Sequence, residues 1–133
     1  MNGGSMTGLI RVGVILLFAL ASCYGNPPGG GPQRSPAVGM VLDSPAGFPN
    51  KEAAMKNDEG VGHLKQEHWD ASATYFRDAL SLSTNMAEAH FNLALALDQM
   101  GSHQEASEHF KTAKELAPNN PKIAENEVLK KHL

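Results

Sequence analysis

Six histidines are the side chains that first suggest chemistry in this sequence, because neutral imidazole is the commonest protein ligand for transition metals. His63 and His68 are five residues apart across an expected turn, and His103 and His109 are six apart in one expected helix. Neither spacing places two imidazoles on one helical face, and the sequence has no H-E-x-x-H motif. We therefore expect surface or interhelical histidines, with no metal site and no cofactor.

Other kinds of catalytic site are also not indicated. The sequence has no G-x-S-x-G motif, and its acidic residues are scattered over expected polar helix faces, where they favour solvation. The only cysteine, Cys23, excludes an internal disulfide and a four-thiolate metal site. A formal charge of −3 and a pI of about 6.0 provide no basic field for nucleic acid. We expect neither an enzyme nor a nucleic-acid-binding protein.

The first 23 residues have the composition of an export signal. Arg11 supplies a thin positive region, and Val12–Leu20 is a short apolar run. The run is shorter than the roughly 20 apolar residues that cross a bilayer. Leu20-Ala21-Ser22-Cys23 resembles the lipobox of bacterial lipoproteins, in which the cysteine thiol receives a diacylglyceryl group and the signal before it is removed.

This resemblance implies a signal peptide over residues 1–22 and a lipid anchor at Cys23, with a membrane as partner. Each buried CH₂ adds about 0.8 kcal/mol, so more than one acyl chain anchors a protein firmly. The alternative is a secretory signal cut after Ala21, which leaves Cys23 as a free thiol. Tyr24 stands where an Asp commonly retains Gram-negative lipoproteins at the inner membrane. We expect the bacterial cell envelope, at the outer membrane facing the periplasm in a Gram-negative source.

Residues 23–50 are predicted to be the lipidated cysteine and a disordered linker. Twelve of the 27 residues from 24 to 50 are Gly or Pro. A segment of this composition buries too little apolar surface to offset its ordering entropy. Gly29-Gly30-Gly31 lacks the flanking strand, helix and Lys-Ser/Thr pair of a phosphate-binding loop. The sequence predicts a tether.

The segment from 87 to 120 carries two amphipathic helical patterns of similar length. Gly101 can take the left-handed conformation that ends a helix, Ser102 with Glu105 predicts a capping box for the next helix, and Pro118 closes the second pattern. The apolar positions of the two patterns are Phe91, Leu93, Ala94, Leu95 and Leu97, then Ala106, Phe110 and Ala113. The segment is predicted to be a helical hairpin.

This hairpin resembles a tetratricopeptide repeat, a helix–turn–helix unit of 34 residues. The resemblance rests on its small, aromatic and turn positions: Leu93-Ala94, Leu97, Gly101, Ala106, Phe110 and Pro118. His90 stands where the family usually has Trp, and Leu97 where it usually has Tyr.

One period earlier, the pattern recurs in a degenerate form. Gly60, Ser72 and Phe76 pair with Ala94, Ala106 and Phe110. Four positions depart from the family, with Glu59, His63, Glu67 and Thr84 in place of Leu, Tyr, the turn Gly and the closing Pro. Gly60 is expected to let the partner helix approach closely, and Gly62 has no such reason.

The expected fold is therefore an all-α domain over residues 51–133, a fragment of an α-solenoid. It consists of repeat 1 at 53–86, repeat 2 at 87–120 and a capping helix at 121–132. Asn50 is expected to cap the first helix, and Ile123, Val128 and Leu129 to cover the open end of the last repeat. Two repeats and a cap are near the lower limit for stability, which makes self-association or a stabilising partner reasonable.

The resemblance also implies a concave groove, lined by the first helix of each repeat, that accepts an extended peptide or a partner helix. Phe91 and Leu95 would be apolar anchors and Asn92 would bond a ligand backbone, with core packing as the alternative for Phe91. A carboxylate clamp is not expected, because only Asn92 and Lys122 match it. The groove residues implied are Asn57, Val61, Leu64, Lys65, Glu88, Phe91, Asn92, Leu95, Asp98, Gln99 and Lys122, with Asn126 near its end.

These expectations combine into a membrane-anchored adaptor or scaffold that binds a protein segment during envelope assembly, secretion or pilus biogenesis. The alternatives are a self-associating structural subunit of an envelope complex, a secreted periplasmic protein without lipid, and an envelope metal or enzymatic role through the histidines.

Overall fold

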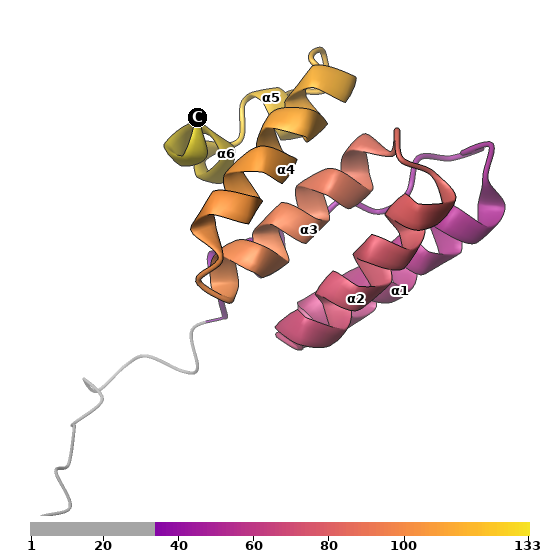
Figure 1. Cartoon of the computed structure of the whole chain (residues 1–133), viewed down its shortest axis with the longest axis horizontal. Helices are drawn as coiled ribbons and strands as arrows, with labels where there is room; N and C mark the ends of the chain where they lie inside the picture. The colour runs from indigo at the N-terminus through magenta and orange to yellow at the C-terminus, as the bar shows by residue number, and fades with distance from the viewer. Residues whose placement is uncertain (1–33) are drawn as a thin grey trace, which may run out of the picture. The chain divides into compact units, whose positions relative to one another are not determined.

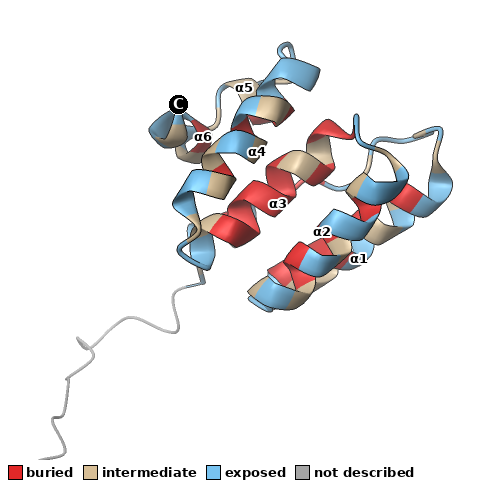
Figure 2. Cartoon of the chain, viewed as in Figure 1, coloured by how far each residue is buried: buried red, intermediate tan, exposed pale blue. Residues whose placement is uncertain are grey.

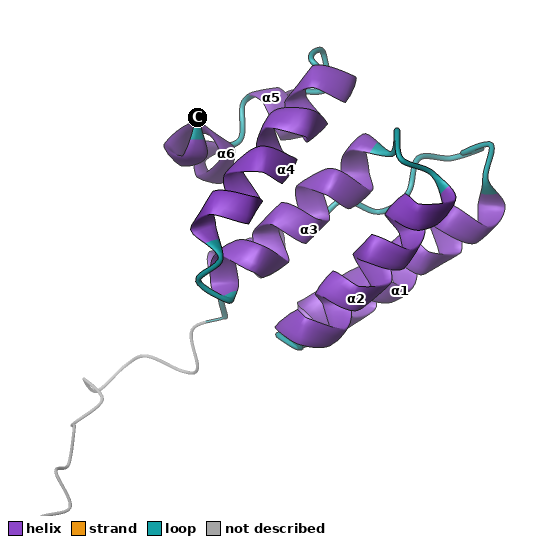
Figure 3. Cartoon of the chain, in the orientation of Figure 1, coloured by secondary structure: helices purple, strands orange, loops and turns teal. Residues whose placement is uncertain are grey.

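The structure, a computed structural model, describes residues 34–133. The predicted signal peptide, the lipobox with Cys23 and the first part of the linker lie outside the described residues. All regular structure from 34 to 133 is helical, so the all-α prediction is confirmed for this part of the protein (Figure 3). Among the same residues, no helix combines the length and apolar character needed to cross a membrane.

Two helical hairpins form the body of the domain (Figure 1). In each hairpin the second helix returns along the first, and α2 also packs against α3, so the two hairpins lie side by side. This is the arrangement predicted for two repeats. The elements are η1 (Pro36–Gly39), α1 (Lys51–Lys65), α2 (Trp69–Leu82), α3 (Ala87–Gln99), α4 (His103–Leu116), α5 (Pro121–Ala124) and α6 (Glu127–His132).

Helix α3 is the centre of the core. Every residue from Phe91 to Leu97 is buried, and Figure 2 shows α3 as a nearly continuous buried band. The reason is its position, since α3 packs against α1, α2, α4 and η1. Phe91 and Phe110 meet edge to face with ring centroids 5.5 Å apart, which joins α3 to α4.

The helix ends follow the sequence signals in part. Asn50 caps α1 as predicted, because its side chain accepts a hydrogen bond from the amide of Ala53 (3.1 Å). Gly101 has φ +79°, the left-handed conformation expected at that turn. The capping box predicted at Ser102 and Glu105 is wrong: Ser102 precedes α4, but its side chain makes no capping hydrogen bond.

Gly60 has the packing role that the repeat pattern predicted. A Cβ atom at this position would lie 2.5 Å from Cε1 of the buried Phe76 ring, so only glycine permits this approach of α2 to α1. A Cβ atom at Gly62 would have no neighbour within 4 Å.

The single capping helix predicted over residues 121–132 is wrong. The backbone forms α5, turns at Glu125 and Asn126, and begins again as α6. Asn126 causes the restart, because its Oδ1 accepts hydrogen bonds from the amides of Val128 and Leu129 and so caps a new helix. Ile123 and Leu129 are both buried in the core, so the predicted covering of the last repeat is confirmed at these two residues.

Candidate functional site

The prediction of a disordered linker is wrong for residues 35–48, which pack on the repeats. Residues 35–44, called the docked segment below, run along α1 and α3, the helices expected to line the groove (Figure 1). The segment is antiparallel to α1: Ser35 lies beside Glu67, just past the end of that helix, and Ser44 beside Ala54, near its start. Phe48 then packs against Ala79, Met86 and Ala89.

Leu42 is the best-held residue of the docked segment. Its amide donates to Oδ1 of Asn92 (2.9 Å), and its carbonyl oxygen accepts from Nδ2 of Asn92 (2.7 Å) and Nδ2 of Asn57 (3.2 Å). Nδ2 of Asn92 also donates to Oδ1 of Asn57 (2.9 Å), which fixes the orientation of both amides. Both Asn side chains are fully buried, so this bonding replaces the water that they lose.

Ser35 and Asp43 of the docked segment are held by exposed polar contacts. The amide of Ser35 donates to Oε1 of Glu67 (2.9 Å), and its hydroxyl lies 2.6 Å from Oε1 of Gln99. Near the other end, Asp43 pairs with Lys65 (3.5 Å). These contacts are exposed to solvent, so each contributes little to stability.

Two apolar side chains anchor the docked segment. Ala37 and Leu42 are 3% and 6% exposed and belong to one hydrophobic cluster with Val61, Leu64 and Leu95. Burying a leucine side chain stabilises a fold by roughly 1.5–3 kcal/mol, more than any of the exposed polar contacts. The docked segment therefore extends the core that two repeats alone would leave open.

The structure brings most of the predicted groove residues together, around a segment of the same protein. Asn57, Asn92, Lys65 and Gln99 each bond or pair with the docked segment, and Val61, Leu64 and Leu95 share its apolar cluster. Glu88 and Lys122 border a shallow depression beside Leu42 and Asp43. Binding of a partner by these residues stays a prediction.

Two of the predicted residues have other surroundings. Phe91 is fully buried against Phe110, so the core-packing alternative holds for it. The Asp98 carboxylate contacts His103 and His132.

The docked segment itself was not predicted from the sequence. Glycine and proline dominate residues 24–50 as a whole, and this average concealed the local pattern in which Ala37 and Leu42 are apolar and separated by five residues. Ser35 before Pro36 was a second signal, since its hydroxyl caps η1 by accepting from the Ala37 amide (3.3 Å).

The histidine pairs considered from the sequence are not the ones that meet most closely in space. His63 stacks on Tyr75 with ring centroids 5.0 Å apart. His109 faces His90, and their Nδ1 atoms are 2.9 Å apart. Burial lowers the pKa of both His90 and His109 below the usual histidine range, and repulsion from His90 lowers the pKa of His109 further.

Comparison with known proteins agrees with this geometry. The family model for the tetratricopeptide repeat matches residues 57–121, which run from within α1 to the first residue of α5. A search of curated proteins gives no match. The paired helices, the close approach at Gly60 and the family match lead to one assignment: residues 57–121 of this protein belong to the tetratricopeptide repeat family.

Proposed function

We propose that this protein is a membrane-tethered adaptor of the bacterial cell envelope, whose groove binds an extended segment of a partner protein during assembly, secretion or pilus biogenesis. Tetratricopeptide repeats are protein-interaction domains and are typically non-catalytic, so the family indicates a role in protein–protein interaction. The family match does not indicate the envelope location or the tether. Both are proposed from the lipobox resemblance at Cys23.

The hydrogen bonding of Leu42 by Asn57 and Asn92 is the observation that carries the proposal. An asparagine amide that pairs with both a backbone amide and a backbone carbonyl selects an extended segment whatever its sequence. The apolar cluster around Leu42 adds a preference for one aliphatic residue. Backbone pairing for affinity and a side-chain pocket for selectivity are the two parts of peptide recognition.

The docked segment indicates the chemistry of the partner. It would be an extended stretch with an aliphatic residue in the place of Leu42, followed by an acidic residue opposite Lys65. The partner would compete with the docked segment for the same two asparagines, and weakening the docked segment would strengthen partner binding.

Photo-crosslinking in intact cells tests the adaptor role. The crosslinking residue is placed at Lys122, which is exposed beside Leu42 and Asp43, with a matched control at exposed Lys111 of α4. We expect a protein adduct from position 122 and none from 111, with a higher yield when Leu42→Ala weakens the docked segment. Equal adducts from both positions, or none from position 122, would contradict the proposal.

The tether has a test of its own. We expect a labelled fatty acid to be incorporated into the wild-type protein and not into Cys23→Ser. Equal label in both proteins would exclude the anchor at Cys23, and absence of label from both would favour the secreted periplasmic alternative.

Self-association is a second candidate function, and the connection of the docked segment to α1 favours it. Residues 45–50 alone join the two, so the docked segment of one copy could enter the groove of another. Sedimentation of the purified protein decides between the two functions. A stable dimer that dissociates on Leu42→Asp indicates a structural subunit, and a monomer at all concentrations excludes self-association.

A further inference from the structure

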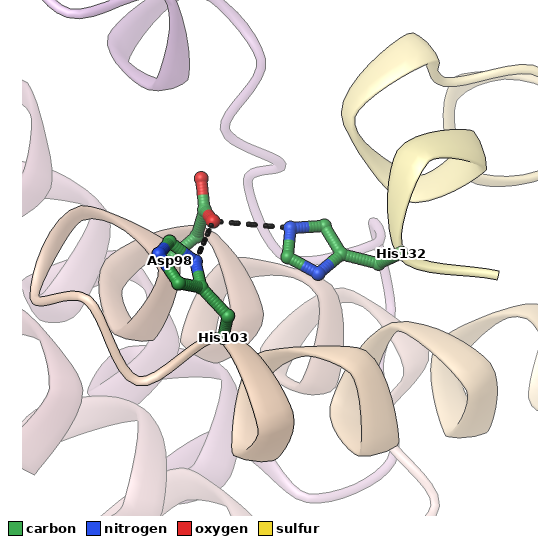
Figure 4. A group of neighbouring side chains, drawn as sticks. All are labelled: Asp98, His103 and His132. Atoms are coloured by element: carbon green, nitrogen blue, oxygen red, sulfur yellow. Dashed lines mark hydrogen bonds and ion pairs between the residues drawn. The ribbon is translucent and has the colours of Figure 1, made fainter.

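Three polar residues from separate parts of the sequence converge next to the turn between α3 and α4. Asp98 ends the buried face of α3, His103 begins α4, and His132 comes from the last turn of α6 (Figure 4). Oδ1 of Asp98 lies 2.8 Å from Nδ1 of His103 and 3.0 Å from Nε2 of His132. One ligand atom from each of the three residues lies within 4.8 Å of the other two.

His132 is oriented by a second contact on its other nitrogen. Its Nδ1 is 2.9 Å from Oγ of Ser107, and the Ser107 hydroxyl donates its single proton to the carbonyl oxygen of His103 (2.9 Å). Oγ therefore accepts a hydrogen bond from Nδ1–H of His132, which leaves the Nε2 lone pair of neutral His132 facing the Asp98 carboxylate. Two acceptors that face each other require a cation between them, either a proton or a metal ion.

We propose that Asp98, His103 and His132 form a binding site for a divalent transition metal of the Zn²⁺ type. Two imidazoles and one carboxylate are a ligand set that Zn²⁺ uses, and a histidine whose second nitrogen is held by a polar group is the usual supporting arrangement. Water would complete the tetrahedron, because His103 borders an open depression lined by residues 101–105 and Glu108.

The two contacts of Asp98 require only a small adjustment, and the two imidazole nitrogens lie within 4.8 Å of each other. Zinc bound at about 2.0–2.1 Å separates neighbouring ligand atoms by roughly 3.3 Å, about half an ångström more than the contacts of Asp98. The side chain of His103 is 68% exposed and can move outward by this amount. His132 and Asp98, which are 12% and 20% exposed, give the site a fixed inner wall.

A metal here would fasten the C-terminal helix to the second repeat. Helix α6 has six residues, of which Leu129 alone is buried, and it packs on α4. A helix this short forms only when tertiary contacts hold it. A metal bridge from His132 to Asp98 and His103 would supply such a contact, and metal binding would stabilise the fold that forms the site.

Titration of the purified, untagged protein with Zn²⁺ and Co²⁺ tests this proposal, in a Cys23→Ser background that removes the only thiol. We expect one metal ion per protein molecule at low-micromolar Kd, the visible absorption of tetrahedral Co²⁺, and a midpoint of thermal unfolding that rises by about 5 °C or more in excess metal. Affinity should fall in acid, because protons compete with the metal for the imidazole nitrogens.

Two variants and one control identify the ligands. His103→Gln changes an exposed side chain and should leave the fold intact while weakening binding at least tenfold, and His132→Gln should do the same. His68→Gln, at an exposed histidine outside the cluster, should bind as the parent does. Absence of binding at 100 µM metal, or equal binding by His103→Gln and the control, would overturn the proposal and leave a triad joined by hydrogen bonds alone.

Discussion

The side-chain amide of Asn92 pairs with both backbone polar groups of Leu42, as a neighbouring β-strand would. Its Oδ1 accepts from the Leu42 amide at 2.9 Å, and its Nδ2 donates to the Leu42 carbonyl at 2.7 Å. Leu42 is buried, so without this pairing its amide would lose water and gain no partner, and its carbonyl would keep only the bond from Asn57. Asn92, together with Asn57, thereby makes it possible for the backbone of the docked segment to enter the core.

Asn92→Ala should therefore be strongly destabilising. The change leaves the Leu42 amide without its partner, and an unsatisfied buried group costs about 1–3 kcal/mol. We expect the free energy of unfolding to fall by about 2–4 kcal/mol in urea titration, and the Leu42 amide to exchange faster with solvent. Gln99→Ala, which removes only exposed contacts to Ser35 and Asp98, should change stability by less than about 0.5 kcal/mol. Similar losses in the two variants would refute the role given to Asn92.

Replacing each of the two glycines of α1 by alanine should change stability in opposite directions. Gly60→Ala places a methyl group against the buried Phe76 ring, and overpacking of this kind costs about 1–3 kcal/mol. Gly62→Ala meets no neighbour and should stabilise α1 by about 0.5–1 kcal/mol through helix propensity and a more restricted unfolded state. Thermal unfolding of the two variants measures the difference. A Gly60→Ala protein as stable as Gly62→Ala would show that α2 can move away without cost.

The Glu67→Gly variant should show which of two contributions of Glu67 to stability is larger: the backbone strain in the turn after α1, or the hydrogen bond to the docked segment. Glu67 has φ 62°, a left-handed conformation that costs a non-glycine residue about 1 kcal/mol, and its carboxylate accepts from the Ser35 amide. We expect the variant to be as stable as the parent or up to about 1 kcal/mol more stable, while the Ser35 amide exchanges faster. Loss of stability would mean that this exposed hydrogen bond outweighs the strain.

The His90–His109 pair should make the domain less stable in mild acid. Nε2 of His90 bonds the Thr84 carbonyl, and the facing Nδ1 atoms share one proton, so a second proton is disfavoured. Because burial lowers both pKa values in the folded protein, the unfolded state binds more protons below pH 6.5. This contribution to stability is complete above the unfolded pKa of 6.5 and is lost as pH falls through the lower folded pKa values.

Thermal unfolding between pH 7.5 and pH 5 measures this effect. The midpoint should drop less steeply in His90→Gln than in the parent, whereas the exposed His68→Gln should follow the parent curve. If the unfolding midpoint changed with pH in the same way in all three proteins, the His90–His109 pair would not be the cause of the acid sensitivity.

The sequence predicted the helices of the repeats better than the contacts between residues that are far apart in the sequence. Helix periodicity, the Gly101 turn and the small residue at Gly60 are local signals, and the structure confirms each of them. The docked segment depends on pairing between Leu42 and Asn92, fifty residues apart, which no local pattern reveals. The histidine cluster was not predicted for the same reason, since His132 and Asp98 are 34 residues apart and a helix break at Asn126 lies between them.

The direction of the docked segment determines how the domain responds to mechanical tension. Ser35, its first residue, is held only by exposed contacts, and the better-held Leu42 follows seven residues later. A force that pulls on the chain before residue 34 would break these contacts one after another, from Ser35 to Leu42, before it acted on α1. Release of the docked segment would uncover Asn57 and Asn92 before the force reached the first helix of the repeats.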